Sequence, residues 1–215
     1  EPEEKGYESY EDPDAYLRLG GANAWSGLTI DSKNGILFAP TGSVSYDFYG
    51  GDRKGDNLFA NSILAINAES GERLWHYQTV HHDVWDRDLP APPVIFNYKL
   101  KDSVIPALAQ VTKSGYTFLL NRITGEPIYD IVERTVPSVS SLTGEKLSKT
   151  QPTPTFPKPF SRQYLSNSDI NPFVSEKEKD SLTKVYLSII KDDIFSPPSE
   201  KGTLIFPGVD GGADW

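Results

Sequence analysis

Short runs of apolar and β-branched residues alternate with turn residues from Gly20 onward. Eight of these runs are predicted to be strands, at 25–30, 36–40, 62–68, 73–79, 93–98, 105–112, 116–121 and 127–132. The chain has 17 glycines and 17 prolines, which supply turns between the runs. Short strands at this spacing indicate an all-β architecture.

The segments on either side of these strands have a different character. Residues 1–19 form an acidic, irregular segment that leads into the strands, which occupy 20–132. Residues 133–202 begin with a Pro/Ser/Thr-rich stretch without regular periodicity and continue into 175–190, where Ser175 and Glu178 have the spacing of a helix capping box. A further strand is predicted at 203–206, and 203–215 then becomes Gly-rich.

An internal repeat indicates how the strands are organised. Residues 65–75 (AINAESGERLW) and 119–129 (LLNRITGEPIY) align as Asn, two variable residues, Ser or Thr, Gly, Glu, two variable residues and an aromatic. In each copy Asn and Ser/Thr can bond to the turn backbone, Gly can supply a positive φ, and the aromatic can dock on a neighbouring unit. Two unrelated turns are the simpler explanation, but the shared register favours a repeated β unit.

The charge and residue counts exclude several classes of protein. With 21 Lys and Arg against 30 Asp and Glu, the net charge is −9, which argues against nucleic acid and anionic membrane surfaces as partners. The chain has no Cys, so neither a disulfide nor a thiol can take part in its chemistry. It also has no Met, so we expect a processed chain or a piece of a longer protein.

The densest group of chemically active residues is in the segment 77–90 (YQTVHHDVWDRDLP), directly after a predicted strand. Its His and Asp residues suit either acid–base chemistry or a metal. Zinc would require spaced N and S ligands, which are missing here, so oxygen ligation of calcium or magnesium is the better expectation. From this segment alone, a charged and solvated loop explains the residues equally well.

The repeat resembles the tryptophan-docking motif of pyrroloquinoline quinone (PQQ)-dependent dehydrogenases, and 81–90 resembles their active-site loop, closest to quinoprotein glucose dehydrogenases. Further matching segments occur in the family's order: GGANAW at 20–25, APTG at 39–42, QVTKSG at 110–115, SPPSEKGT at 196–203 and FPG at 206–208. The resemblance implies a β-propeller of eight four-stranded blades. By residue count this chain would cover about three blades, together with a long insertion that carries one short helix.

The resemblance also assigns roles to individual residues. Asp86 matches the catalytic base, which would take the proton from the substrate hydroxyl. Lys113 matches a cofactor contact that stabilises negative charge on the quinone oxygen, and Trp25 matches the aromatic floor beneath the PQQ ring. Asp214 matches a further cofactor contact. The alternatives are a turn Asp, a surface Lys and a core Trp.

Metal ligation is expected from Asp86, Asp88 and Ser43. Many relatives have Asn at the position of Ser43, and a hydroxyl is a poorer oxygen donor than an amide, so the metal, Ca²⁺ or Mg²⁺, would be held differently here. His81 or His82 could orient Asp86 or bind the sugar, and a packed histidine is the equal alternative.

The resemblance implies PQQ-dependent oxidation of an aldose, of the glucose-to-gluconolactone type. Electrons would pass to a quinone or cytochrome partner, and the full-length protein would be periplasmic or membrane-associated facing the periplasm. A propeller that serves as a scaffold for envelope-protein assembly is the main alternative.

A hydrolase with Asp86 and Asp88 as paired carboxylates is a third hypothesis, because side chains two apart on a strand point the same way, roughly 6–7 Å apart. Lys113 and the repeat are not explained by it. An isolated three-blade piece would expose unclosed faces, and self-association through them is one expected outcome.

Overall fold

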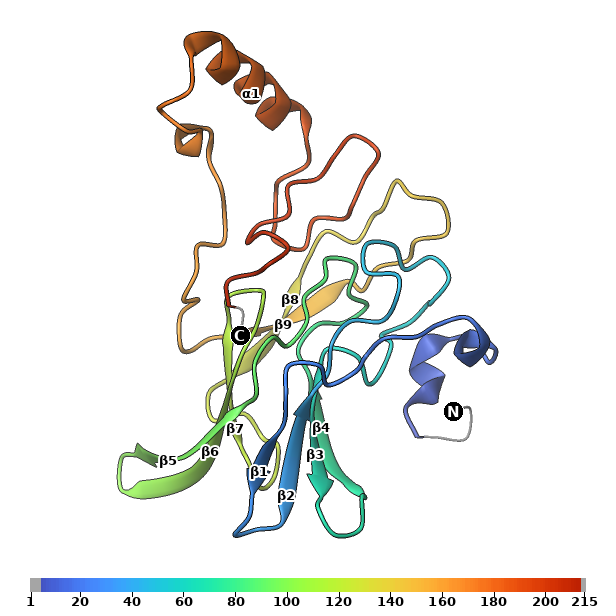
Figure 1. The fold of residues 1–215 in the computed structure, drawn as a ribbon, viewed down its shortest axis with the longest axis vertical. Coiled ribbons are helices and arrows are strands. Elements are labelled where there is room, and N and C mark those ends of the chain that lie inside the picture. Colours follow the sequence, from blue (N-terminus) through green and yellow to red (C-terminus); the bar gives the residue numbers. More distant parts are fainter. Residues whose placement is uncertain (1–4, 214–215) are drawn as a thin grey trace.

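A computed structural model describes residues 5–213 (Figure 1). The strands form three antiparallel sheets. The elements in chain order are η1 (Tyr7–Tyr10), η2 (Ala15–Leu17), β1 (Thr29–Asp31), β2 (Ile36–Pro40), β3 (Ser62–Asn67), β4 (Arg73–Gln78), β5 (Val94–Leu100), β6 (Ser103–Val111), β7 (Thr117–Asn121), β8 (Ile131–Thr135), β9 (Thr150–Pro154), η3 (Asn167–Asp169) and α1 (Glu176–Ser188).

The first sheet is a four-stranded meander in the order β1-β2-β3-β4. Successive side chains of a strand point to opposite faces of the sheet, and those of Phe38, Ile63 and Ala65 point into a core. Each of the three is fully buried there. The same core includes Leu108 and Leu120 from β6 and β7, so the first two sheets share one apolar layer. Burial of these side chains is the main force that holds the sheets together.

The second sheet has the order β5-β6-β7, and the third is the pair β8-β9. The predicted run at 127–132 divides here: Pro127 makes an isolated bridge to Leu120, and regular pairing begins only at Ile131. Among residues 5–213 one sheet has four strands, one has three and one has two. The three sheets match the three predicted blades in number. The first sheet alone has the four strands expected of a blade within the described residues.

Two sequence predictions about the second half of the chain were wrong in detail. The Pro-rich stretch is not structureless, because Thr150–Pro154 pairs with Ile131–Thr135 as strand β9. Its prolines are tolerated because β9 pairs only with β8 within the described residues. The strand predicted at 203–206 is reduced to a single parallel bridge between Ile190 and Thr203.

The helix predicted at 175–190 is present as α1, and it begins with the expected capping box. The backbone nitrogen of Ser175 donates to Glu178 at 2.9 Å, and the Ser175 hydroxyl accepts from the Glu178 nitrogen at 3.3 Å. The helix projects from the sheets on a long excursion (Figure 1), and no residue of it is buried. Its apolar side chains, such as Val185, are therefore exposed here. No helix within residues 5–213 has the length and apolarity needed to cross a bilayer.

The two copies of the repeat form the same turn. Gly71 and Gly125 have φ of 76° and 77°, and their backbone nitrogens donate to Asn67 and Asn121 at 2.9 and 2.8 Å. Trp75, which ends the first copy, lies against the turn of the second copy, and its indole nitrogen donates to the Arg122 carbonyl at 3.2 Å. The aromatic of the first copy thus contacts the turn of the second copy.

This contact gives a stability prediction with a matched control inside the chain. A Cβ at Gly125 would lie 2.7 Å from the Trp75 ring, whereas a Cβ at Gly71 would meet nothing within 4 Å. Both substitutions by Ala incur the positive-φ cost of about 1–2 kcal/mol. Gly125→Ala should add about 1–3 kcal/mol for overpacking. Urea unfolding that shows equal losses for both variants would contradict the Trp75 packing.

The sheet ends determine where chemistry can take place. The turns at 32–35 and 68–72 join strands at one end, and the long connections 41–61 and 79–93 leave from the other end. Trp25 precedes β1, and Lys113 lies in the turn between β6 and β7, so both also lie at that second end. The candidate residues from four separate segments are therefore brought to one side of the sheets.

Candidate active site

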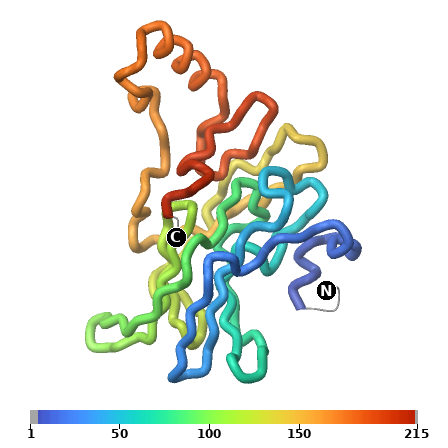
Figure 2. The backbone as a smooth tube through the Cα atoms, in the orientation of Figure 1, coloured from blue at the N-terminus to red at the C-terminus, as the bar shows by residue number. Residues whose placement is uncertain are grey.

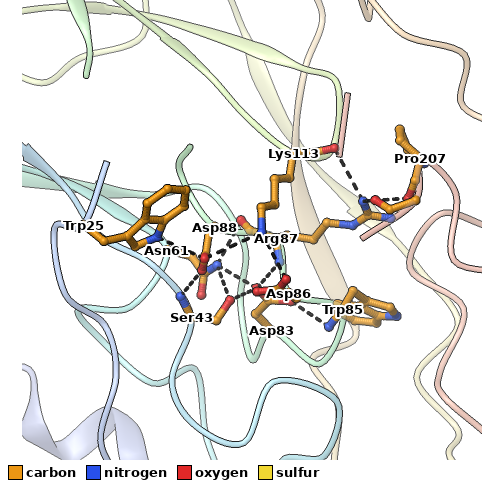
Figure 3. Close-up of polar contacts among 11 residues, drawn as sticks. Trp25, Ser43, Asn61, Asp83, Trp85, Asp86, Arg87, Asp88, Lys113 and Pro207 are labelled. Carbon is orange, nitrogen blue, oxygen red and sulfur yellow. Dashed lines mark hydrogen bonds and ion pairs between the residues drawn. The ribbon is translucent and has the colours of Figure 1, made fainter. Parts of the chain in front are cut away.

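The connection between β4 and β5 carries the central carboxylates of the site (Figure 3). Within it, Val84 and Trp85 are buried in an apolar cluster. The Trp85 indole nitrogen donates to the Ser196 carbonyl at 2.7 Å, and its ring packs edge-on against Phe195 at 5.2 Å. This anchoring fixes the backbone that leads into Asp86.

Asp83 is the buried acceptor around which the loop is folded; it is 2% exposed. Its Oδ1 accepts from the Trp85 backbone nitrogen at 2.8 Å, and its Oδ2 accepts from the Arg87 backbone nitrogen at 2.6 Å. Oδ2 also accepts from the Asn61 side-chain amide at 2.7 Å and from the Ser43 hydroxyl. A carboxylate that accepts from several donors fixes them in one arrangement, because the buried charge would otherwise be unpaired.

Asp86 lies between two of these anchored residues and has φ of 58°, a left-handed conformation that is uncommon for a residue with a side chain. Its Oδ2 accepts from the Lys113 ammonium at 3.0 Å. Burial raises the pKa of Asp86 to about 6; the hydrogen bond from Lys113 opposes this rise, and the negative charges of Asp88 and Asp83 add to it. A carboxyl that titrates near neutrality is suited to proton transfer.

Asp88 joins three segments. Its Oδ2 accepts from the Trp25 indole nitrogen at 3.0 Å and lies 3.7 Å from the Lys113 ammonium. Its Oδ1 accepts from the Ser43 backbone nitrogen. A Cβ at Gly42 would lie 2.8 Å from Asp88 and 3.1 Å from the Trp25 nitrogen, so only glycine fits at that position.

Lys113 and Trp25 complete the cluster. The Lys113 side chain is 10% exposed, and its ammonium lies between Asp86 and Asp88 (Figure 3). It also lies 5.9 Å from the centre of the Trp25 ring. Trp25 itself is 40% exposed, so the indole is not a core side chain. A partly open aromatic plane beside a fixed ammonium can receive a flat, negatively charged ring.

The structure brings together four of the predicted site residues: Trp25, Asp86, Asp88 and Lys113. Ser43 joins them through its backbone, whereas its hydroxyl donates to Asp83. Asp214 lies outside the described residues.

Neither His81 nor His82, the two histidines considered as partners of Asp86, is hydrogen-bonded to it. His81 contacts Gln78 and Glu133, and His82 contacts Gly55 and Glu145.

Asp83, Asn61 and Arg87 complete the site, although the sequence patterns did not assign them a role. Arg87 is fully buried, and its Nη1 donates to the Pro207 carbonyl at 2.9 Å. Within residues 5–213 its Nε and Nη2 have no hydrogen-bond partner. The dense run of charges after β4 is the signal that could have identified Asp83 and Arg87. Charged side chains are almost never fully buried unless they are paired.

The described residues alone do not fit a divalent cation. No group of three or more His, Cys, Asp or Glu side chains within residues 5–213 is arranged to hold a metal. The Lys113 ammonium already supplies positive charge to Asp86 and Asp88. We therefore derive no step through a metal ion, and ligation by Asp86, Asp88 and Ser43 stays a prediction.

Comparison with known proteins gives the family. All 215 residues match the model of the glucose/ethanol/alcohol dehydrogenase β-propeller domain that uses PQQ. Quinoprotein glucose dehydrogenase A of Acinetobacter calcoaceticus is 38% identical over an alignment of 207 positions that covers 90% of this chain and 25% of that protein. Quinate/shikimate dehydrogenase (quinone) of Acinetobacter baylyi is 33% identical over 94% of this chain and 25% of its own length.

A solved structure supports the same assignment. The quinohemoprotein alcohol dehydrogenase of Pseudomonas putida HK5 superposes with a TM-score of 0.51 at 29% identity, over 64% of this chain and 22% of that one. The chain spans about a quarter of the length of the curated relatives it matches. The three antiparallel sheets and the family match agree with the predicted propeller. This chain belongs to the β-propeller family of PQQ-dependent glucose, ethanol and alcohol dehydrogenases.

Proposed function

We propose that the full-length protein containing this chain oxidises an aldose sugar, of the glucose-to-gluconolactone type, with PQQ as cofactor. The observation that carries the proposal is the contact between Asp86 and the Lys113 ammonium, at 3.0 Å, beside the open face of Trp25. A carboxyl with a pKa raised to about 6 is a suitable base for a sugar hydroxyl.

The residues present suit PQQ as well as this reaction. PQQ is a flat, anionic quinone, and the chain offers an exposed indole plane at Trp25 and a cation at Lys113. When bound, the cofactor would supply the acceptor for the two electrons and the hydrogen that leave the sugar carbon as hydride. Lys113 would hold positive charge at the site. Asp88 would keep Trp25 in place through the indole nitrogen.

The chain's own chemical step is proton transfer. An Asp86 carboxylate oxygen would take the proton of the hydroxyl on the sugar carbon while the C–H bond of that carbon breaks. The hydroxyl oxygen thereby loses a proton and the carbon loses a hydride, and the C–O group becomes the carbonyl of a lactone. Below its pKa of about 6, Asp86 already carries a proton and cannot act as the base.

The aldose assignment is supported by similarity to several proteins named as glucose dehydrogenases, from Acinetobacter calcoaceticus, Escherichia coli and Gluconobacter oxydans. Similarity to quinate/shikimate and glycerol dehydrogenases makes cyclic and linear polyols the competing substrates. Dye reduction by the PQQ-loaded protein should give the highest kcat/KM with glucose or another aldose. A preference for quinate or glycerol would contradict the substrate assignment and leave the cofactor assignment intact.

Asp88 provides a pH prediction. Its negative charge raises the pKa of Asp86, so Asp88→Asn should lower that pKa. The rise of kcat/KM with pH, which follows ionisation of Asp86, should then occur at lower pH than in the wild type. Asp102→Asn is the matched control, because it removes the same charge from an exposed turn between β5 and β6. Superimposable profiles for Asp88→Asn and the wild type would contradict this electrostatic coupling.

We further propose that the electrons leave to a quinone or cytochrome acceptor, and that the protein works in the periplasm or on a membrane facing it. Both points rest on the family resemblance. Activity with a soluble quinone analogue and fractionation of cells expressing the full-length protein would test them. A strictly cytoplasmic location would contradict the second point.

A scaffold propeller is the second candidate function, because the repeat and Trp75 would serve it equally well. A scaffold does not require a raised carboxyl pKa beside a buried ammonium, and the Asp86–Lys113 pair therefore favours the enzyme.

A further inference from the structure

His82 lies four residues before Asp86, and its ring is enclosed by two segments distant in sequence. The residue is 1% exposed. Its Nδ1 lies 2.7 Å from the Gly55 carbonyl oxygen, and its Nε2 lies 2.8 Å from Oε1 of Glu145. Figure 2 shows the segment around residue 50 beside the one around residue 145, and the Gly50 nitrogen donates to Glu145 Oε2 at 2.7 Å.

The hydrogen-bond partners define the protonation of this ring. The Gly55 carbonyl can only accept, so Nδ1 carries a proton. Burial alone would raise the pKa of Glu145, but hydrogen bonds from His82 and Gly50, with the positive charge of Arg53 nearby, lower it overall. Glu145 is therefore an ionised acceptor, and Nε2 carries a proton too. In this geometry the His82 ring joins the Gly55 carbonyl to a fully buried Glu145 side chain.

The surroundings are shaped to fit this pair. A Cβ at Gly50 would lie 2.3 Å from the His82 Nε2, so position 50 requires glycine. The His82 backbone has φ of 46°, an uncommon conformation for a non-glycine residue, and its nitrogen donates to the Asp56 carbonyl at 3.3 Å. An unfavourable backbone conformation persists only where surrounding contacts hold it.

We propose that His82 and Glu145 are positioning residues that clamp the loop carrying Asp86 in its working geometry. The clamp acts through the next residue, Asp83, whose carboxylate accepts from the backbone nitrogens of Trp85 and Arg87 on either side of Asp86. The inference rests on the proposed function, because Asp86 is the base there. A displacement of about 1 Å at such a group can cost about 10²-fold in rate.

The clamp depends on the contact between the His82 ring and Glu145. The charged groups around it are Glu145, Asp83 in the same loop, and Arg53, which donates to the Asp83 carbonyl and acts electrostatically on Glu145. In Glu145→Gln the amide can still bond to Nε2, but the carboxylate charge is lost, so the contact is weakened rather than removed.

The test uses the full-length, PQQ-loaded protein. At neutral pH Glu145→Ala should lower kcat about 10- to 100-fold, with KM and bound-cofactor absorbance little changed. Glu133→Gln is the matched control, because the neighbouring His81–Glu133 pair has a similar 3.1 Å contact with Glu133 53% exposed, and it should not change kcat. E145Q keeps a hydrogen bond to Nε2 but loses the carboxylate charge, and it should lower kcat less than Glu145→Ala does.

Hydrogen exchange measured by mass spectrometry separates this inference from the proposed function. In Glu145→Ala the amides of 80–88 should exchange at least about 10-fold faster, and those of β5 and β6 should not change. This readout stands even if the wild type shows no PQQ-dependent activity, a result that would refute only the proposed function. Unchanged exchange in Glu145→Ala would overturn the clamp. If Glu145→Ala fails to fold, E145Q supplies both measurements.

Discussion

Asp86→Asn should abolish most of the activity of the full-length protein, with kcat lower by about 10²- to 10⁴-fold. The substitution keeps the shape of the side chain and removes its ability to take a proton. Because Asp86 accepts from Lys113 and lies between backbone positions held by Asp83, the amide should occupy the same place. Steady-state dye reduction with saturating PQQ and sugar measures the loss.

The same variant separates a catalytic role from a structural one. The native pKa of Asp86, about 6, is above its ordinary value of 3.8, so the folded state binds the proton more tightly. Stability contributed by this group is therefore present at low pH and falls as pH rises between these values. At pH 7 the ionised carboxylate is disfavoured in the fold, and Asp86→Asn should keep or raise the unfolding free energy. Unchanged kcat would refute the role of Asp86 as base.

Lys113→Met should cause the second largest loss, about 10²- to 10³-fold in kcat. Its ammonium is the positive charge against both Asp86 and Asp88, and it is almost buried, so water cannot replace it fully. Loss of its hydrogen bond to Asp86 should also raise the pKa of that carboxyl further, and the rise of kcat/KM with pH should move to higher pH.

The matched control for Lys113→Met is Lys99→Met, since Lys99 lies on β5 with an exposed side chain. It should leave kcat and the pH profile unchanged. Lys113→Arg keeps the charge but changes the donor geometry, and we expect it to recover only part of the rate. Full activity in Lys113→Met would refute the electrostatic role of this residue.

Periodicity and turn chemistry predict much of this fold. Alternation located β2, β3, β4 and β7 to within a residue or two, because these strands bury one face in a shared core. The repeat predicted two equivalent turns, because the positive φ at Gly71 and Gly125 can be recognised from Asn-x-x-Ser/Thr-Gly alone. The capping box predicted the start of α1. The repeat turns and the capping box are both interactions between residues close in sequence, so local sequence is enough to predict them.

Non-local pairing was harder to predict. Strand β9 was missed because its prolines mask a strand that pairs only with β8 in the described part of the chain. The strand predicted at 203–206 is reduced to one bridge, because local residue preference does not supply a pairing partner.

The site residues also divide into those that the sequence identified and those whose roles depend on non-local contacts. Resemblance identified Trp25, Asp86, Asp88 and Lys113, and the fold brings them together from three segments. Glu145 could not be assigned from sequence, because its role depends on His82, a partner 63 residues away.

The direct test of Asp86 as the base in a PQQ-dependent oxidation is reconstitution of the full-length protein with PQQ, calcium, glucose and a dye acceptor. Wild type and Asp86→Asn are measured in parallel. We expect dye reduction by the wild type that requires PQQ. We also expect loss of at least about 10²-fold in Asp86→Asn, with PQQ absorbance retained after desalting in both. No dye reduction by the wild type and no retained PQQ absorbance would contradict the proposed PQQ-dependent oxidation and favour a scaffold propeller.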